Sequence, residues 1–330
     1  MAFNFGGNMK RIIVVMSTYN GADCLEKQIE SIFAQKGVEV SCLVRDDGST
    51  DNSGEICDYY GANDGRIEVY HIQNAGVSNA RNQGLNYAKG KYIYFFDPDD
   101  SLEPDALWTL YKQIKNGADL VECSYFKDFT NVKEEVIHPE KKISSQEAIR
   151  SLLLWDGYLT SFCWDKLYNK EKIGDIRFDS KLKIGEDNLF VFEYLLKCES
   201  VIVLDCPLYN YLIRENSAIG NVYTEKKKDS VRAAGTIYEI CSKRSMMHYE
   251  AKIHVGLASF FSYANLLNTV PYEKIKEFKS DCKFYIDSMK VCSCGLLWKL
   301  VGIKMTILYK TAQYIPFLYK ASGFIRRKSR

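Results

Sequence analysis

Long hydrophobic runs are missing from this sequence. No segment contains about 18 uninterrupted apolar residues, the length that a helix needs to cross a bilayer. The first residues, Met1–Asn8, are polar and glycine-rich, and they lack the apolar stretch of a secretory signal. We therefore expect a cytoplasmic protein without an ordinary transmembrane helix.

Histidine is scarce, and the motifs of several enzyme classes are absent. The four histidines, at positions 71, 138, 248 and 254, are scattered and do not form the H-E-x-x-H pattern of zinc proteases. No G-x-S-x-G, P-loop or G-x-G-x-x-G is present. Serine hydrolysis, ATP hydrolysis and dinucleotide binding therefore lose their usual sequence support.

Neither charge sign dominates the composition. The formal charge of +2 and the isoelectric point near 7.9 argue against a surface built to bind polyanions, so we expect no nucleic-acid partner. The 11 cysteines form no C-x-x-C pair, which favours reduced thiols. Cys292 and Cys294 lack a neighbouring histidine or a further cysteine, so a metal site is not expected there.

The first half of the chain alternates strand-like and helix-like segments. Short β-branched runs are typical of buried strands, and the segments between them place apolar residues at helical spacing. We predict strands at 11–18, 38–45, 66–72, 91–96 and 119–126, and helices at 23–35, 54–60, 78–88 and from Pro104. This alternation predicts a Rossmann-like α/β fold, with a mixed, mostly parallel sheet flanked by helices. Ligands of such sheets bind beyond the carboxyl ends of the strands.

The second half is less regular. A capping box at Ser144–Glu147 predicts a helix through Trp155, and further patterns predict a helix at 186–197 and a strand at 200–204. From about residue 224 the pattern is helical throughout. We divide the chain into an N-terminal extension (1–9), an α/β domain (10–222) and a helical C-terminal region (223–330).

An acidic run, Asp97-Pro98-Asp99-Asp100, follows the apolar strand that ends at Phe96. Residues i and i+2 of an extended chain share a side, and Pro98 biases Asp97 towards extended backbone. Two adjacent carboxylates repel unless a cation neutralises them, and Mg²⁺ or Mn²⁺ would suit such oxygen ligands. The alternative is an acidic surface turn that caps the next helix, and we assign that capping role to Asp100.

Two other strand ends carry polar residues. Asp46-Asp47-Gly48-Ser49-Thr50-Asp51 could offer a carboxylate to the imide N–H of a uracil, or be a plain turn with a helix cap. The segment 74–82 has a glycine that permits close backbone approach, Ser78 as a helix cap, and Arg81 in the first helical turn. Arg81 could face a phosphate or a base, or be a solvated helix arginine.

These segments together carry a family resemblance. Thr18-Tyr19-Asn20-Gly21, Asp-Asp-Gly-Ser-Thr-Asp, Gly-Val-Ser-Asn-Ala-Arg-Asn and Phe-Asp-Pro-Asp-Asp occur in this order within residues 10–125. The set resembles glycosyltransferase family 2, whose members are inverting enzymes with the GT-A fold. One departure is Pro98, where a small residue such as serine is more usual. Both outer carboxylates are kept.

The resemblance implies roles for individual residues. Residues 10–125 would bind the nucleotide-sugar and residues 126–222 the acceptor. Asp99 would ligate the metal, with Asp97 near the ribose or bound through water, and Asp47, with Asp46 as its rival, would contact the base. The full set expected to bind the nucleotide-sugar is Ser17, Thr18, Tyr19, Asn20, Asp46, Asp47, Asn74, Ser78, Arg81, Asp97 and Pro98.

Three weaker motifs lie in the second half. Trp164-Asp165-Lys166-Leu167-Tyr168 resembles a lysine-leucine-tyrosine element of bacterial family members. Gly185-Glu186-Asp187-Asn188 resembles the family's Glu-Asp motif, which makes Asp187 the expected catalytic base and Glu186 its neighbour. Ordinary acidic charge at a helix start is the alternative. Arg214 resembles a residue near the leaving diphosphate, or it is an exposed loop arginine.

The C-terminal stretch, residues 296–330, combines apolar residues, aromatics and lysines, and it ends in Arg326-Arg327-Lys328-Ser329-Arg330. A basic, aromatic-rich amphipathic helix can lie in a membrane interface, which would place the protein at the inner face of the plasma membrane. The alternative is a helix packed on the catalytic domain or on a second subunit of a homo-oligomer.

The resemblance therefore implies an inverting glycosyltransferase. It would use Mn²⁺ or Mg²⁺ and a UDP-sugar, and it would act on a hydroxyl of a glycan or lipid-linked acceptor in bacterial surface polysaccharide synthesis. A nucleotidyltransferase is one alternative, but the glycine-rich loop with a lysine that it needs after the first strand is missing. A non-catalytic membrane-surface scaffold is the other.

Overall fold

The computed structural model describes residues 11–129, 132–213 and 223–320. The chain forms two compact units, and neither is a single continuous segment. The first contains the described parts of Met1–Ala148, Ser161–Ser180 and Glu193–Ile213; the second contains those of Ile149–Thr160, Lys181–Phe192 and Arg214–Arg330. The predicted boundary near residue 222 falls in the undescribed segment 214–222, and the second unit also takes in two earlier pieces of chain.

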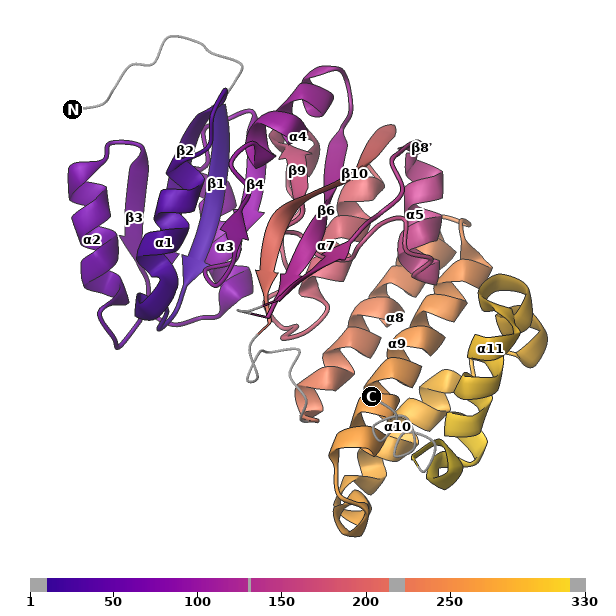
Figure 1. Cartoon of the computed structure of the whole chain (residues 1–330). Helices are drawn as coiled ribbons and strands as arrows, with labels where there is room; N and C mark the ends of the chain where they lie inside the picture. Colours follow the sequence, from indigo (N-terminus) through magenta and orange to yellow (C-terminus); the bar gives the residue numbers. More distant parts are fainter. Residues whose placement is uncertain (1–10, 130–131, 214–222, 321–330) are drawn as a thin grey trace. The chain divides into compact units, whose positions relative to one another are not determined.

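The first unit is built on a 10-stranded sheet with the strand order β3-β2-β1-β4-β9-β6-β10-β5 (Figure 1). Its N-terminal half is parallel and matches the predicted strands: β1 (Arg11–Thr18), β2 (Glu39–Asp46), β3 (Ile67–His71) and β4 (Tyr92–Phe96). The helices α1 (Ala22–Phe33), α2 (Ser53–Asn63), α3 (Val77–Tyr87) and α4 (Ala106–Lys115) follow the predicted positions within a few residues. The strand–helix alternation is therefore confirmed.

The other half of the sheet contains strands that the sequence pattern did not predict. β9 (Lys166–Asn169) lies antiparallel between β4 and β6 (Leu120–Asp128). β10 (Ser200–Leu212) is parallel to β6 and much longer than predicted. Three short strands, β5 (Ser101–Leu102), β7 (Lys133–Val136) and β8 (Lys141–Ser144), pair antiparallel with β10 or β6. The sheet is thus mixed.

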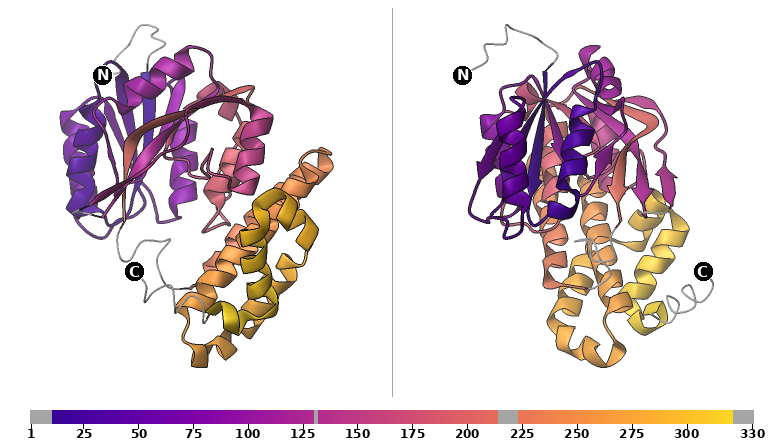
Figure 2. Two further views of the ribbon diagram at one scale, coloured as in Figure 1. Left: turned by 45° about the vertical axis from the view of Figure 1, so that its right-hand side comes forward. Right: turned by 60° about the vertical axis from the view of Figure 1, so that its left-hand side comes forward.

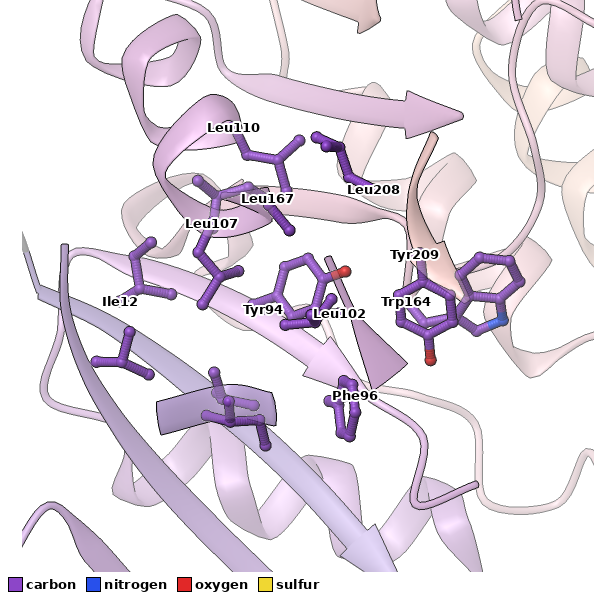
Figure 3. Packing of buried hydrophobic residues seen from close by; sticks show 14 of the residues in the cluster. Ile12, Tyr94, Phe96, Leu102, Leu107, Leu110, Trp164, Leu167, Leu208 and Tyr209 are labelled. Carbon is purple, nitrogen blue, oxygen red and sulfur yellow. The ribbon is translucent and has the colours of Figure 1, made fainter. Parts of the chain in front are cut away.

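The core of this unit explains why the chain adopts these strands. Alternate residues of β1 and β4, such as Ile12, Tyr94 and Phe96, are buried on the same side of the sheet (Figure 3). Leu107 and Leu110 of α4 belong to the same buried cluster. Each large side chain removed from water contributes roughly 1.5–3 kcal/mol. Because β-branched and aromatic residues favour strands, local preference and burial agree here.

The second unit is helical, as the pattern beyond residue 224 predicts. It contains α8 (Lys228–Lys243), α9 (His248–Thr269), α10 (Lys279–Met289) and α11 (Cys294–Tyr314), and α8 and α9 pack lengthwise (orange in Figure 2). The boundary between the units falls within α5 (Ser145–Leu154) and α7 (Glu186–Leu195). The predicted capping box opens α5, with the Glu147 amide donating to Ser144 Oγ at 3.3 Å and the Ser144 amide to Glu147 Oε2 at 2.9 Å.

Across the described ranges, no single helix has both the length and the apolar content needed to cross a membrane. One bent pair, Tyr272–Met289 with Cys294–Tyr314, reaches that content only when its two parts are counted together, across an angle of 101°.

Candidate active site

The carboxyl ends of β1, β2 and β4 lie side by side, which brings the predicted loops to one edge of the sheet. Thr18 is in register with Asp46, and Met16 with Phe96. Ser17 and Thr18 are buried, whereas Tyr19 is 51% exposed. Ligands of α/β sheets bind at such an edge. The structure therefore gathers the residues predicted from three separate motifs.

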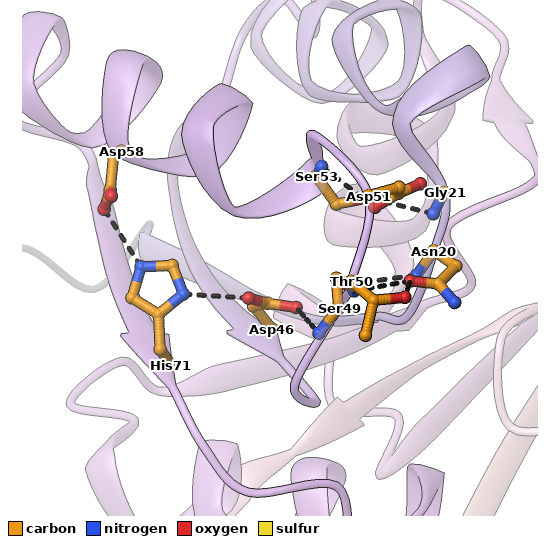
Figure 4. Close-up of polar contacts among 9 residues, drawn as sticks. All are labelled: Asn20, Gly21, Asp46, Ser49, Thr50, Asp51, Ser53, Asp58 and His71. Atoms are coloured by element: carbon orange, nitrogen blue, oxygen red, sulfur yellow. Dashed lines mark hydrogen bonds and ion pairs between the residues drawn. The ribbon is translucent and has the colours of Figure 1, made fainter.

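The loop after β1 is joined to the loop after β2 by side-chain hydrogen bonds (Figure 4). Asn20 has a positive φ of 50°, and its amide donates to Ser49 Oγ at 3.0 Å. Its side-chain carbonyl accepts the Thr50 amide at 2.8 Å. The Gly21 amide donates to Ser53 Oγ at 2.9 Å. These bonds hold the two loops as one rigid surface. Ser49 and Thr50 thus join the two loops, and the N-cap residue of α2 is Asn52, which makes no side-chain cap hydrogen bond.

Asp46 lies at the centre of a polar chain on the α2 side of the sheet (Figure 4). Its carboxylate accepts the Ser49 amide at 3.0 Å and contacts His71 Nδ1 at 2.8 Å, while His71 Nε2 contacts Asp58 at 3.0 Å. Burial raises the pKa of Asp46, but the hydrogen bonds from Ser49 and His71 outweigh it and hold that pKa below its ordinary value. Hydrogen bonds to Asp58 and Asp46 raise the pKa of His71.

Asp47 holds the loop that precedes α3. Its two carboxylate oxygens accept the amides of Ala75 and Gly76, each at 2.8 Å. Gly76 has φ of 88° and is the N-cap of α3, so Ser78 does not cap the helix, contrary to the prediction; it is a buried residue inside the first turn. Each Asp47 oxygen keeps a second lone pair. Whether Asp47 or Asp46 contacts a base stays a prediction, as does the role of the exposed Asn74.

Arg81 connects α3 to the acidic run. Its guanidinium donates to Asp97 Oδ1 at 2.7 Å, and the arginine side chain is only 5% exposed. The helix can lie this close to the sheet because Gly84 has no side chain. A Cβ atom at this position would lie only 2.4 Å from Val15 Cγ1. The interpretation of Arg81 as a solvated helix arginine is therefore wrong. Its contact with a nucleotide stays a prediction.

The four residues of the acidic run differ in their environment. Asp97, Pro98 and Asp99 are partly exposed, whereas Asp100 is buried. Asp100 accepts the Tyr209 hydroxyl at 2.6 Å and the Leu212 amide at 2.8 Å. Burial, followed by the charge of Asp97, raises the pKa of Asp100 well above its ordinary value. Asp100 thus fastens the run to β10, and the expectation that it caps the next helix is wrong.

Asp97 and Asp99 are the residues that fit a metal ion. Among the described residues, no three or more His, Cys, Asp or Glu side chains form a group that could hold a metal. Mg²⁺ and Mn²⁺ do not need such a cage, because they commonly use one or two carboxylates together with substrate phosphates and water. Two partly exposed carboxylates at the ligand edge of the sheet fit this donor set.

An aromatic stack beside the run was not predicted. The ring of Trp164 stacks on Tyr209 at 4.3 Å and on Tyr211 at 5.3 Å. Burial, and then the charges of Asp100 and Asp97, raise the pKa of Tyr211 to about 12, as expected of a tyrosine that lies close to the acidic run.

The Trp164–Tyr168 motif overlaps β9, which begins at Lys166. Lys166 is fully buried and pairs with Glu122 at 2.8 Å and Asp165 at 2.7 Å.

Glu186 and Asp187 begin α7, within the helical unit. Gly185 precedes them with φ of 90°, and a side chain there would lie 3.1 Å from Ser230 Cα of α8. The next residue, Asn188, contacts His254 Nε2 of α9 at 2.9 Å, and His254 Nδ1 contacts the Leu153 carbonyl at 3.2 Å. Burial lowers the pKa of His254 to about 4, so this histidine is neutral near pH 7. The Glu-Asp motif is thereby fixed against two helices.

One predicted residue, Arg214, lies outside the described residues. The partners that the sequence did not reveal are His71, Tyr209, Tyr211 and His254. They could not be found because their contacts join positions 25, 47, 66 or 109 residues apart and depend on the tertiary fold.

The chain is similar to known proteins in both sequence and fold. Residues 13–176 match the model of the family described as Glycosyl transferase family 2. The glycosyltransferase GlyA of Streptococcus pneumoniae is 36% identical over 228 residues, which cover 66% of this chain and 32% of GlyA. The minor teichoic acid biosynthesis protein GgaB of Bacillus subtilis is 32% identical over 211 residues, covering 62% of this chain and 23% of GgaB. The chain thus spans about a third or less of these two relatives.

The fold is also similar to that of a solved structure. TarS of S. aureus (residues 1–349), solved in complex with UDP-GlcNAc, is 19% identical with a TM-score of 0.72. The match covers 98% of this chain and 93% of the TarS chain. The similarity confirms the predicted fold class, a mixed α/β sheet flanked by helices with a helical C-terminal region.

Proposed function

We propose that this chain, a member of glycosyltransferase family 2, is a glycosyltransferase that moves a sugar from a UDP-sugar to a hydroxyl group of a glycan or lipid-linked acceptor. The product would be part of a bacterial cell-surface polysaccharide. The UDP donor is supported by the UDP-GlcNAc complex of TarS, and the surface polymer by the name of GgaB.

The observation that carries the proposal is the convergence of Thr18, Asp47, Arg81 and Asp97 at the carboxyl edge of β1, β2 and β4. A nucleotide diphosphate has a base, a ribose and two charged phosphates, and it needs hydrogen-bonding and charged groups in one place. Arg81 is rigidly held by Asp97 at 2.7 Å and would hold the nucleotide with little loss of side-chain entropy. Ser17, Tyr19 and Asn20 would complete the surface for the nucleoside.

We assign the general base to Asp187. The acceptor hydroxyl attacks the anomeric carbon from the side opposite the diphosphate, and Asp187 takes the hydroxyl proton as the new C–O bond forms. The bond from the anomeric carbon to the phosphate oxygen breaks, and its electron pair leaves with UDP. This single displacement inverts the anomeric centre and needs no covalent enzyme intermediate, unlike a retaining glycosidase. Glu186, in the same helical turn, adds negative charge at the N-terminus of α7.

Asp99, supported by Asp97, would hold the Mn²⁺ or Mg²⁺. When bound, such an ion neutralises the charge that develops on a leaving diphosphate. Arg81 contributes a fixed positive charge at the same edge, and Arg214 would add a second.

Two variants test these roles separately. Asp187→Asn keeps the shape of the side chain but cannot accept a proton, so UDP binding should be retained while transfer falls at least about 100-fold. Asp99→Ala should remove the metal-dependent part of UDP binding. Asp205→Asn, an exposed position on β10, is the matched control. Binding is measured calorimetrically with Mn²⁺ and with EDTA, and transfer with a panel of UDP- and GDP-sugars.

Each result has a clear meaning. Full transfer by Asp187→Asn would remove that residue as the base. UDP binding that is unaffected by both EDTA and Asp99→Ala would refute the metal site. A chain that binds GDP-sugars in place of UDP-sugars would refute the proposed donor.

A further inference from the structure

Helix α11 has a row of exposed apolar side chains. Ile303 is 55% exposed, Ile307 58% and Tyr314 69%, and their spacing of four and seven residues places them on one face of the helix. Phe317 and Leu318 continue the exposed apolar surface at 61% and 46%. Isolated exposed apolar residues are common, but a contiguous row of them marks an interaction surface.

The row does not arise from poor packing of α11. α11 is kinked at Gly302, which has φ of 83°, and the face opposite the row in its second part is buried. Tyr309 and Ala312 on that face are fully inaccessible and belong to the core of the helical unit, as does Leu297 of the first part. The Tyr309 hydroxyl donates to the Met289 carbonyl at 2.6 Å, and Ser293 caps the helix by accepting the Leu296 amide at 3.2 Å. The helix is therefore fixed in place while its apolar row faces outwards.

The sequence that contains this row carries charge of one sign. From Ser288 to Arg330 the sequence contains nine lysines and arginines and no acidic residue, so this stretch carries a formal +9. Since the whole chain carries +2, the preceding 287 residues carry −7. Lys299 and Lys304 are exposed on α11, and among the residues that the structure places neither pairs with a carboxylate.

The exposed apolar row and the positive charge together distinguish between two binding partners, a second copy of the chain and an anionic lipid surface. In a symmetric dimer the same patch would face itself, and its lysines would repel each other. An anionic lipid surface instead complements the charge, and its headgroup region accommodates aromatic and apolar side chains next to lysines. Exposed Trp298, 63% accessible, is of the type that is enriched at membrane interfaces.

We propose that α11 and residues 315–320 bind an anionic lipid bilayer, such as the cytoplasmic leaflet of the plasma membrane. Ile303, Ile307 and Tyr314 enter the boundary between headgroups and acyl chains, and Lys299 and Lys304 lie at the lipid phosphates. The helix lies along the surface and does not span it. The proposal does not depend on the donor or on the catalytic base, and it brings the enzyme to the place where a lipid-linked acceptor would be.

The test measures binding of the full chain to large unilamellar vesicles by flotation. Vesicles of phosphatidylcholine alone are compared with vesicles that also contain phosphatidylglycerol. The wild-type chain should bind only the second kind, and more weakly as salt increases. The double variant Ile303→Ser/Ile307→Ser should lose on the order of tenfold in affinity for each isoleucine. Lys299→Glu/Lys304→Glu should lose roughly 30-fold or more.

Matched controls use the other unit. Ile137→Ser removes an isoleucine that is 48% exposed there, and Lys36→Glu/Lys115→Glu reverses two exposed lysines, one in the loop after α1 and one at the end of α4. These variants should bind vesicles like the wild type. Because all substituted side chains are exposed, circular dichroism and the thermal midpoint should be unchanged for every variant.

Three outcomes would overturn the proposal. One is the absence of wild-type binding to the anionic vesicles. Another is equal loss of binding in the control and α11 variants. The third is a wild-type dimer in analytical ultracentrifugation that Ile303→Ser/Ile307→Ser converts to monomer while vesicle binding is unchanged, because the row would then be a contact between two copies of the chain.

Discussion

Asp100 shows how a single buried side chain can hold the acidic run at the carboxyl edge of the sheet. It is buried behind the acidic run and joins that run to β10 through Tyr209 and the Leu212 amide. Its neighbours Asp97 and Asp99 are the expected metal ligands. Their positions therefore depend on a residue whose own carboxylate faces inwards.

Asp100→Asn tests this support at the residue scale. An asparagine has the same volume but only one acceptor oxygen, so either the Tyr209 hydroxyl or the Leu212 amide loses its partner. An unsatisfied buried donor costs about 1–3 kcal/mol, and we expect the free energy of unfolding in urea to fall by about that amount. Metal-dependent UDP binding should also weaken. Asp205→Asn is again the control, and unchanged stability of Asp100→Asn would contradict the interpretation.

At this scale the sequence predicted positions better than partners. Asp46, Asp47, Arg81 and Asp97 were singled out because they follow strand ends, and the structure brings them to one edge. The hydrogen bonds that Asp47 makes to Ala75 and Gly76 could not be predicted, since they join two loops whose distance is set by the fold. A carboxylate that stabilises a loop occurs in the same sequence pattern as a carboxylate that binds a ligand.

At the scale of elements, the start of α7 depends on two other helices. Gly185 packs against α8, and Asn188 contacts the buried His254 of α9. The long helical region is thus more than an appendage, because it fixes the segment that carries the proposed base.

His254 makes this arrangement sensitive to acid. Its pKa in the folded chain is about 4, below the ordinary value of 6.5, so the unfolded chain binds the proton more readily. The contribution of neutral His254 is complete above about pH 6.5 and is lost as the pH falls towards 4. Since one pKa unit corresponds to about 1.4 kcal/mol, this shift lowers the free energy of unfolding by about 3 kcal/mol at most.

The measurement is the free energy of unfolding in urea between pH 7 and pH 4.5, for the wild type and for His254→Gln. The difference between the two proteins should shrink as the pH falls, since glutamine cannot take up a proton. His71, whose pKa is raised, titrates in both proteins and cancels in the comparison. A difference that is constant with pH would show that His254 does not titrate in this way.

The elements that were predicted correctly share one property. β1, β2, β4 and the helices between them have strong local periodicity, and burial reinforces it. β9 was missed because it is only four residues long and begins with a lysine. Lys166 is tolerated there because Glu122 and Asp165 neutralise it, and Glu122 comes from a strand that is 44 positions earlier in the chain.

At the scale of the whole molecule, most of the cysteines are buried in the core. All 11 lie in the described ranges and are free thiols, and Cys294 is the exposed one among them. Burial raises the pKa of Cys57 to about 12 and the pKa values of Cys241 and Cys292 to about 11. Protonated, inaccessible thiols react slowly with disulfide reagents.

We therefore expect one thiol per chain to react rapidly with a thiol-specific disulfide reagent in native buffer, and all 11 to react in denaturant. Cys294→Ser should abolish the rapid phase and leave the thermal midpoint unchanged, whereas Cys57→Ser should leave the rapid phase intact. Fewer than 11 reactive thiols in reducing-agent-free denaturant would reveal a disulfide and contradict the expectation.

The discontinuous units have a consequence for synthesis on the ribosome. Asn188 precedes its partner His254 by 66 residues. At roughly 5–20 residues per second, the nascent chain spends about 3–13 s with that asparagine already made and the histidine not yet added. The sheet can be complete by then, since β10 ends at Leu212. The start of α7 must therefore wait for translation to finish α9, and slowing translation between these points would prolong the exposure of the segment to proteases and chaperones.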